Sequence, residues 1–324
     1  MKFPARLLSA LLHAAALAAC AHDAAAQNLP DRAVVLDPLG DHTADTNGFT
    51  WLNATQLHGE FSRYSNGSGA HHRWNAKSGG FIEFARWDST WSIGMMGTME
   101  MVADAASDIG FNPRAIFWEE GVLASARLSH DAAFQFGYVH RCKHDVDNLE
   151  PYLYSNRIEQ YTLIYSGVTT RLLLRPRLVA DGPVQLFAGA AVRNDAFLHL
   201  YDERHPQEAE RTGRNMYTLA DAVNLTARMD ARLHDARYGL HLSANGMLSL
   251  FGSGTDPGGR WRNLQIETAV PFVELGLDLF NPHAGAFTIF ARGEWQRDGA
   301  IAPFATPARL FAVGIRATSW QTMW

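Results

Sequence analysis

The stretch Phe134–Asp147, which reads F-Q-F-G-Y-V-H-R-C-K-H-D-V-D, decides the fold. Aromatic residues occupy every second position of its first half: Phe134, Phe136 and Tyr138. Because successive side chains of a β-strand point to opposite faces, this pattern predicts one strand with an aromatic face. The same phase places His140 and Cys142 on the aromatic face, and the chain then turns polar and acidic.

The same alternation recurs in about twelve segments between residues 56 and 316, which predicts an all-β protein. Every second link between these segments is short: 88–90, 129–131, 180–183, 234–236 and 281–284. The links between them are longer and polar: 65–78, 103–114, 144–157, 195–216, 252–262 and 299–306. Short periplasmic turns that alternate with long outer loops are typical of an outer-membrane barrel, whereas a soluble sandwich has no reason to sort its loops in this way.

Composition agrees with such a barrel. The chain has 324 residues and a net charge of −5, so no basic excess points to nucleic acid. Mean hydropathy is −0.16, too polar for a bundle of membrane helices. Alternating strands hide their apolar face from a window average, so this value is compatible with a membrane barrel.

Charged residues in the polar phase are expected to face the lumen of the barrel: Glu60, Glu83, Glu100, Arg228, Asp230, Arg292 and Glu294. Opposite signs would pair there and fill a narrow interior. We therefore predict a closed antiparallel up-and-down transmembrane β-barrel of about twelve strands over residues 54–324, inserted by the barrel-assembly machinery, with a soluble periplasmic β-protein as the alternative.

Residues 1–26 read as a signal peptide, with a positive start, an apolar stretch and a small-residue cleavage site before Gln27. The stretch Leu17–Cys20 also resembles a lipobox, so cleavage near Gln27 and acylation of Cys20 both stay open. Residues 27–53 are polar and irregular, and we interpret them as a periplasmic N-terminal segment or short plug. Either reading implies export from a bacterial cytoplasm, and together with the barrel pattern it predicts the bacterial outer membrane as the location.

His140 and Cys142 are two residues apart and share a face of their strand, so an imidazole could activate the neighbouring thiol. This strand is the fifth of the expected barrel and runs from the periplasm to the cell surface. The side chains of His140 and Cys142 would therefore face lipid near its outer end. The stretch Tyr138–His144 resembles outer-membrane phospholipase A and the lipid A deacylase barrels, which carry His-x-Ser near the end of a lipid-facing strand. Cys142 replaces the serine, and Lys143 and His144 stand where the phospholipase pattern has Asn and Gly.

The resemblance implies hydrolysis of lipid esters that reach the site sideways through the outer membrane. It also implies a third catalytic residue on the next strand, with Asn156 and Glu159 as the candidates. The structural alternative is that Cys142 is a small apolar residue on the lipid-facing wall, and that His140 lies in the interfacial belt.

Oxygen ligands recur at Asp145, Asp147 and Asn148, which could hold a calcium ion in the loop after this strand. The alternative is a solvated acidic loop. For the whole protein, two function classes stay open: an enzyme acting on outer-leaflet lipid, and a non-enzymatic narrow pore or lipid- or small-molecule-binding barrel.

Overall fold

The computed structural model describes residues 36–39, 48–52, 55–65, 73–103, 113–145, 162–202, 217–233, 237–253, 264–281, 285–296 and 308–319. Within these ranges the chain forms strands. They are β1 Phe49–Trp51, β2 Thr55–Tyr64, β3 Trp74–Trp87, β4 Trp91–Ala103, β5 Pro113–Ser129, β6 Ala132–Asp145, β7 Thr162–Ala180, β8 Val184–Asp202, β9 Tyr217–Leu233, β10 Tyr238–Ser253, β11 Leu264–Asn281, β12 Gly285–Gln296 and β13 Ala308–Ser319. No helix suited to crossing a bilayer occurs in the described part of the chain.

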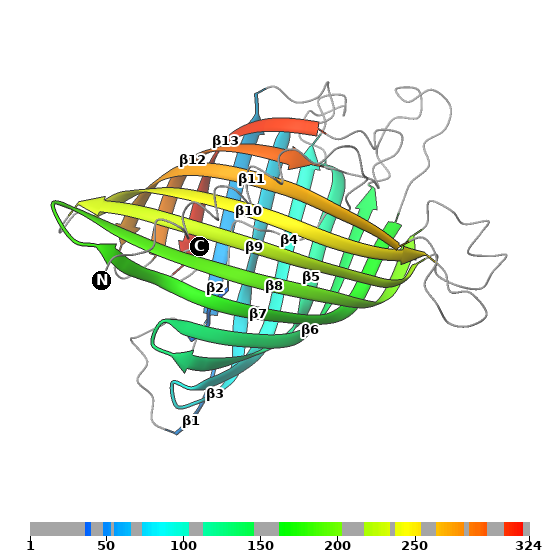
Figure 1. Ribbon diagram of the computed structural model, residues 1–324, viewed down its shortest axis with the longest axis horizontal. Helices are drawn as coiled ribbons and strands as arrows, with labels where there is room; N and C mark the ends of the chain where they lie inside the picture. Colours follow the sequence, from blue (N-terminus) through cyan, green and yellow to red (C-terminus); the bar gives the residue numbers. More distant parts are fainter. Residues whose placement is uncertain are drawn as a thin grey trace.

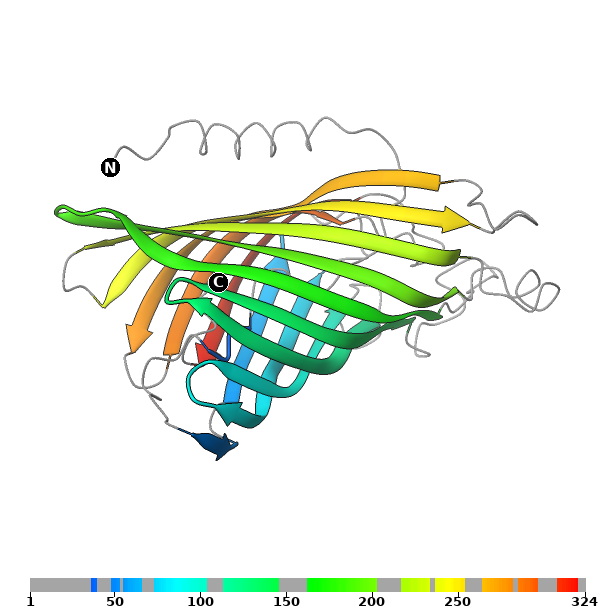
Figure 2. The same cartoon turned by 60° about the horizontal axis from the view of Figure 1, so that its bottom comes forward.

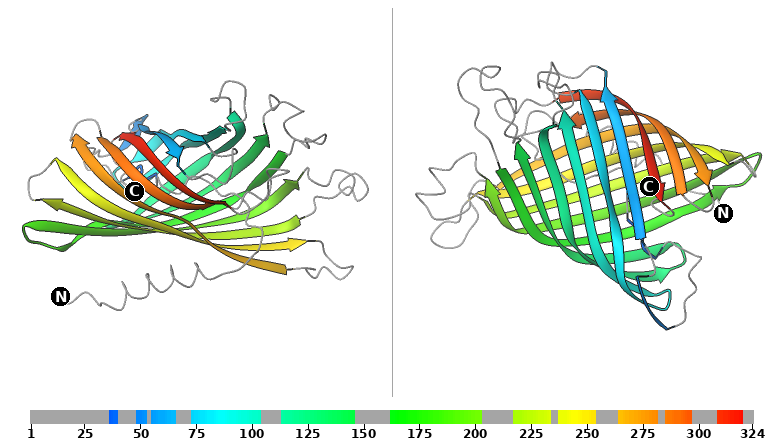
Figure 3. Two further views of the ribbon diagram at one scale, coloured as in Figure 1. Left: turned by 90° about the horizontal axis from the view of Figure 1, so that it is seen from above. Right: turned by 180° about the vertical axis from the view of Figure 1, so that it is seen from behind.

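Strands β2 to β13 form a closed barrel of twelve antiparallel strands, as the sequence predicted. Each strand pairs with the next one in sequence, and β13 returns to pair with β2 through the register Ala312–Tyr64 to Thr318–His58. In Figure 1, β7 to β10 cross the front of the barrel at a steep angle to β2 to β5 behind them, and Figure 3 gives the views from above and behind. Such tilt is what closing a sheet into a barrel requires.

The short strand β1 pairs with the last residues of β3, beyond the part of β3 that pairs with β2. Phe49–Trp51 pairs with Ala85–Trp87 of β3, whereas β2 pairs with the earlier part of the same strand. Leu52 follows β1 with a φ of 48°, in the left-handed region, and this bend separates the two strands. Figure 2 shows β1 at the end of the barrel where the β3–β4 and β5–β6 hairpins turn. Pairing with the barrel therefore begins before residue 54.

The alternation of short and long links is confirmed. Short links join β3 to β4, β5 to β6, β7 to β8, β9 to β10 and β11 to β12, and longer links join the other successive pairs from β2 to β13. All short links therefore lie at one end of the barrel, which we call the short-turn end. The opposite end carries the longer links and is called the long-loop end.

The outer wall is apolar, and the exposed large side chains alternate along each strand. On β6, Phe134, Phe136 and Tyr138 are 40%, 51% and 52% exposed, which confirms the predicted aromatic face. Similar rows run along the other strands, including Leu240 and Leu242 of β10 and Leu275, Leu277 and Leu279 of β11. Trp51, Trp87 and Trp91 gather at the short-turn end, where an aromatic girdle is typical of membrane barrels.

The interior contains an apolar cluster in addition to polar groups. Phe81, Met96, Leu123 and Val139 pack together from four successive strands, and Leu36 joins them. Gly137 makes room for this packing, because a Cβ there would lie 2.6 Å from Leu123 Cδ2 and 2.1 Å from the Val122 carbonyl oxygen. Side chains thus fill this part of the lumen.

The wall supports a prediction about its surroundings. Leu275 is 56% exposed on the outer face of β11. In lipid vesicles, Leu275→Arg should lower the free energy of unfolding by about 2–4 kcal/mol, because a cation on the lipid face near the bilayer centre is costly. Urea titration followed by tryptophan fluorescence measures this, with Leu275→Met as the matched apolar control. Equal stability of the two variants would contradict a lipid-facing wall.

Candidate functional site

Three polar side chains lie side by side on the outer wall. The register pairs His140 of β6 with Glu120 of β5 on one side and with Ser166 of β7 on the other. Directly opposed residues of neighbouring strands have Cβ atoms about 4.5–5.5 Å apart and share a face. Glu120, His140 and Ser166 therefore form one row across three strands, which we call the outer row.

His140 is hydrogen-bonded to the serine of this row. Its Nδ1 lies 2.8 Å from Ser166 Oγ. The serine is only 8% exposed and the imidazole is half-buried, so both groups are largely shielded although they belong to the outer face. A hydroxyl in contact with an imidazole nitrogen is the minimum arrangement for base-assisted nucleophilic attack.

Glu120 lies on the other side of His140 and is exposed. Its neighbours in the same phase of β5 are Trp118 and Val122, which are 39% and 45% exposed on the apolar wall. An ionisable side chain among lipid-facing apolar residues is costly, so its presence calls for a functional explanation. A carboxylate beside the imidazole supplies one, because it can orient the ring and stabilise its protonated form.

The row lies in the half of the wall nearer the long-loop end. His140 precedes the end of β6 at Asp145 by five residues, roughly 16 Å along an extended strand. Apolar outer-face residues continue towards the short-turn end, among them Tyr138 and Phe136. The row therefore lies within the apolar wall, on the side of its middle nearer the long-loop end.

Of the predicted catalytic residues, one belongs to the outer row, one lies beside it, and two lie outside the described residues. His140 belongs to the outer row. Cys142 is 3% exposed and lies against Trp118, its partner on β5, with which it forms a hydrogen bond. The next strand, expected to supply the third residue, contributes Ser166 opposite His140. Asn156 and Glu159 lie outside the described residues, so their roles stay predictions.

The predicted calcium ligands are only partly described. Asp145 is the last residue of β6, and its backbone pairs with Ala115 of β5. Asp147 and Asn148 lie outside the described residues. A calcium site in this loop stays a prediction from the sequence.

Ser166 and Glu120 were not identified as site residues from the sequence. Glu120 did leave a signal, because it interrupts the apolar phase of Ile116, Trp118 and Val122. Ser166 left none, since it lies in a segment of irregular alternation and its position opposite His140 depends on the register of β6 and β7. The register of strands joined by a long loop cannot be read from alternation alone.

The lumen holds dense clusters of paired charges. Arg292 contacts Glu60 at 2.8 Å, Glu274 at 2.6 Å and Glu294 at 3.1 Å. Arg316 contacts Glu60 at 2.8 Å and Glu274 at 2.7 Å. A second cluster joins Glu119 to Arg141 and to Arg193, the latter at 2.8 Å. The predicted pairing of inward charges is therefore confirmed, including Arg228 with Asp230 at 2.7 Å and Arg292 with Glu294.

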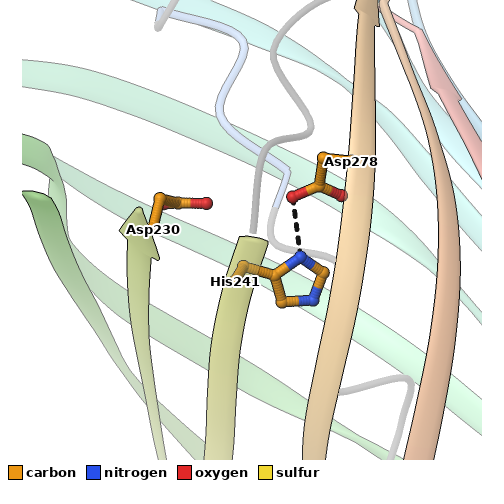
Figure 4. Close-up of side chains that lie close together, drawn as sticks. All are labelled: Asp230, His241 and Asp278. Atoms are coloured by element: carbon orange, nitrogen blue, oxygen red, sulfur yellow. Dashed lines mark hydrogen bonds and ion pairs between the residues drawn. The ribbon is translucent and has the colours of Figure 1, made fainter. Parts of the chain in front are cut away.

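Asp230, His241 and Asp278 form a further lumenal group whose ligand atoms lie within 4.8 Å of one another (Figure 4). The geometry could suit a metal ion, but the existing contacts already use these groups. His241 Nδ1 lies 2.7 Å from Asp278 and its Nε2 lies 2.9 Å from Glu274, an arrangement that suits an imidazolium donating from both nitrogens. Arg228 bridges both aspartates at 2.7 and 2.6 Å. We interpret the group as part of the ion-pair network.

Similarity to known proteins is found among solved structures. No family model matches the chain, and a search of curated proteins finds no match. Among solved structures, outer membrane phospholipase A from Escherichia coli has a TM-score of 0.43 and 10% identity, covering 81% of this chain and 91% of that one. LpxR from Salmonella typhimurium has a TM-score of 0.40 and 7% identity, covering 82% and 99%. The transport unit of the autotransporter AIDA-I from E. coli has a TM-score of 0.41 and 10% identity, covering 86% and 92%. These similarities cover more than four-fifths of this chain.

The lumenal network yields a stability prediction. Arg292→Met should lower the free energy of unfolding by about 3–5 kcal/mol, because three buried carboxylates lose a cation that contacts them. Urea titration in detergent measures the change. Arg63→Met, which removes an exposed arginine from β2, is the control and should change stability little. Equal effects of the two substitutions would contradict a structural role for the network.

Proposed function

We propose that this protein is an integral barrel of the bacterial outer membrane that hydrolyses acyl esters of outer-leaflet lipids at the outer row. The apolar wall and the sorted links support the membrane placement, with the short-turn end in the periplasm. The observation that carries the proposed chemistry is the 2.8 Å contact between His140 Nδ1 and Ser166 Oγ, with Glu120 opposed to the same histidine.

The proposed mechanism assigns one task to each residue. Ser166 Oγ attacks the ester carbonyl carbon, and His140 accepts the hydroxyl proton at Nδ1. The resulting imidazolium then donates this proton to the departing alkoxide, leaving an acyl group on Ser166. A water molecule, deprotonated by the same histidine, releases the fatty acid and restores the hydroxyl.

Glu120 acts as the positioning residue of this mechanism. When Nδ1 is the base, the neutral imidazole carries its proton on Nε2, and a carboxylate in the same row can accept that N–H. Holding Nε2–H fixes the tautomer and stabilises the imidazolium that forms during attack. Glu120 is the carboxylate that the register places opposite His140.

The location of the row fits a substrate that arrives through the bilayer. Trp118, Val122 and Tyr138 surround it with exposed apolar surface on which acyl chains can lie. Paired charges and the Phe81 cluster occupy the described part of the lumen, which argues against a wide pore and leaves the narrow pore as the alternative.

The choice of nucleophile gives a direct test. Ser166→Ala should lower the rate of phospholipid ester hydrolysis in mixed micelles by at least about 10⁴-fold, because the attacking oxygen is lost. Cys142→Ala should leave the rate within about twofold of the unaltered protein, since a spectator thiol adds no transition-state contact. Thr170→Ala, another outer-face hydroxyl of β7, is the matched control.

Loss of hydrolysis in Cys142→Ala together with full activity in Ser166→Ala would transfer the nucleophile to the cysteine. Absence of hydrolysis in the unaltered protein, combined with steady conductance in planar bilayers, would instead favour the narrow pore.

Glu120→Gln should keep the arrangement of the outer row while removing the negative charge of the Glu120 side chain. We expect kcat to fall by about 10²- to 10⁴-fold with little change in KM, because the carboxylate assists the charged transition state more than the bound ester. Glu120→Asp should recover part of the rate. A glutamine variant with unaltered kcat would exclude Glu120 from the mechanism.

A further inference from the structure

Inside the barrel, near the short-turn end, the wall binds a short segment of the chain's own N-terminal region. Leu36, Asp37 and Leu39 are 2%, 2% and 0% exposed. Leu36 packs into the cluster of Phe81, Met96, Leu123 and Val139. Such burial is unusual for a segment that precedes the first strand and has no strand partner.

Each of the four main-chain carbonyls of this segment is bound by a different lumenal side chain. Gln135 Nε2 donates to the Leu36 oxygen at 2.8 Å and Gln56 Nε2 to the Asp37 oxygen at 2.8 Å. The Pro38 and Leu39 oxygens accept hydrogen bonds of 2.7 Å from two arginines, Arg86 and Arg127. The donors come from β6, β2, β3 and β5, so the segment is held from several sides.

An ion pair adds specificity to these backbone contacts. Arg175 of β7 binds both carboxylate oxygens of Asp37, with Nε at 2.6 Å from Oδ2 and Nη2 at 3.1 Å from Oδ1. A bidentate guanidinium–carboxylate pair is strong and directional, particularly where both partners are buried. Arg175 also donates to the carbonyl oxygen of His130 at 2.8 Å, which ties the pair to the β5–β6 turn.

We propose that the lumen is a binding site for a short peptide, that Leu36–Leu39 is its resident occupant, and that this occupant plugs the short-turn end of the barrel. The glutamines and arginines recognise the peptide backbone, and Arg175 selects an acidic side chain at the second position. The segment also supports the inner side of β5, β6 and β7, whose outer side carries the outer row.

Thiol labelling tests the plug independently of any hydrolysis. In a background with Cys20→Ser and Cys142→Ser, the Leu39→Cys thiol should react with a maleimide–polyethylene glycol reagent at least about tenfold more slowly than a Trp51→Cys thiol. Trp51 is 69% exposed, whereas Leu39 is 0% exposed. Equal labelling rates at the two positions would overturn the proposal.

The ion pair gives a second test. Adding Asp37→Ala should accelerate labelling of the Leu39→Cys thiol by about tenfold and leave the Trp51→Cys thiol unchanged, because only the plug loses its anchor. The exchanged pair Asp37→Arg with Arg175→Asp should restore slow labelling. Heat-dependent gel migration verifies that each barrel is folded. Folded Asp37→Ala with unaltered labelling would show that the ion pair does not retain the segment.

Discussion

The pairing of β13 with β2 is the contact on which the rest of the structure depends. A strand edge facing lipid would leave its N–H and C=O groups without partners, so a membrane sheet has to close on itself. The seam is also joined from inside the lumen, where Arg316 of β13 lies opposite Glu60 of β2 and contacts it at 2.8 Å. Arg292 of β12 reaches the same carboxylate. Ion pairs between residues far apart in sequence thus reinforce the backbone pairing that closes the barrel.

Alternation lets one strand carry two kinds of chemistry. On β6, His140 belongs to the outer row and Arg141, the next residue, faces inward and binds Glu119 of β5. Glu119 and Glu120 are likewise adjacent, one inside and one outside. Because a slip of one residue would exchange the two faces, the buried Glu119–Arg141 pair favours the register that sets Glu120 opposite His140. The interior therefore helps to determine the arrangement on the outer surface.

Much of the fold could be predicted from the sequence, because it rests on local patterns. The phase of Phe134, Phe136 and Tyr138 gave the outer face of β6, and the inward charges Arg228 and Asp230 pair as expected. The candidate site was harder to predict from the sequence, because its residues come together only through the register between strands. His140 was identified through its neighbour Cys142 two residues away, but its structural neighbours are Glu120, twenty residues earlier, and Ser166, which lies beyond a long loop. Alternation assigns a face to each residue and leaves the lateral alignment of strands open.

The outer row draws a single residue from each of three strands, so no two of its members are close in the chain. Glu120, His140 and Ser166 become neighbours only after β5, β6 and β7 have paired. Before these strands pair, Ser166 and His140 have no contact imposed by the chain itself, because 26 residues separate them. Under the proposed function, ester hydrolysis would therefore require that all three strands are paired in the closed barrel.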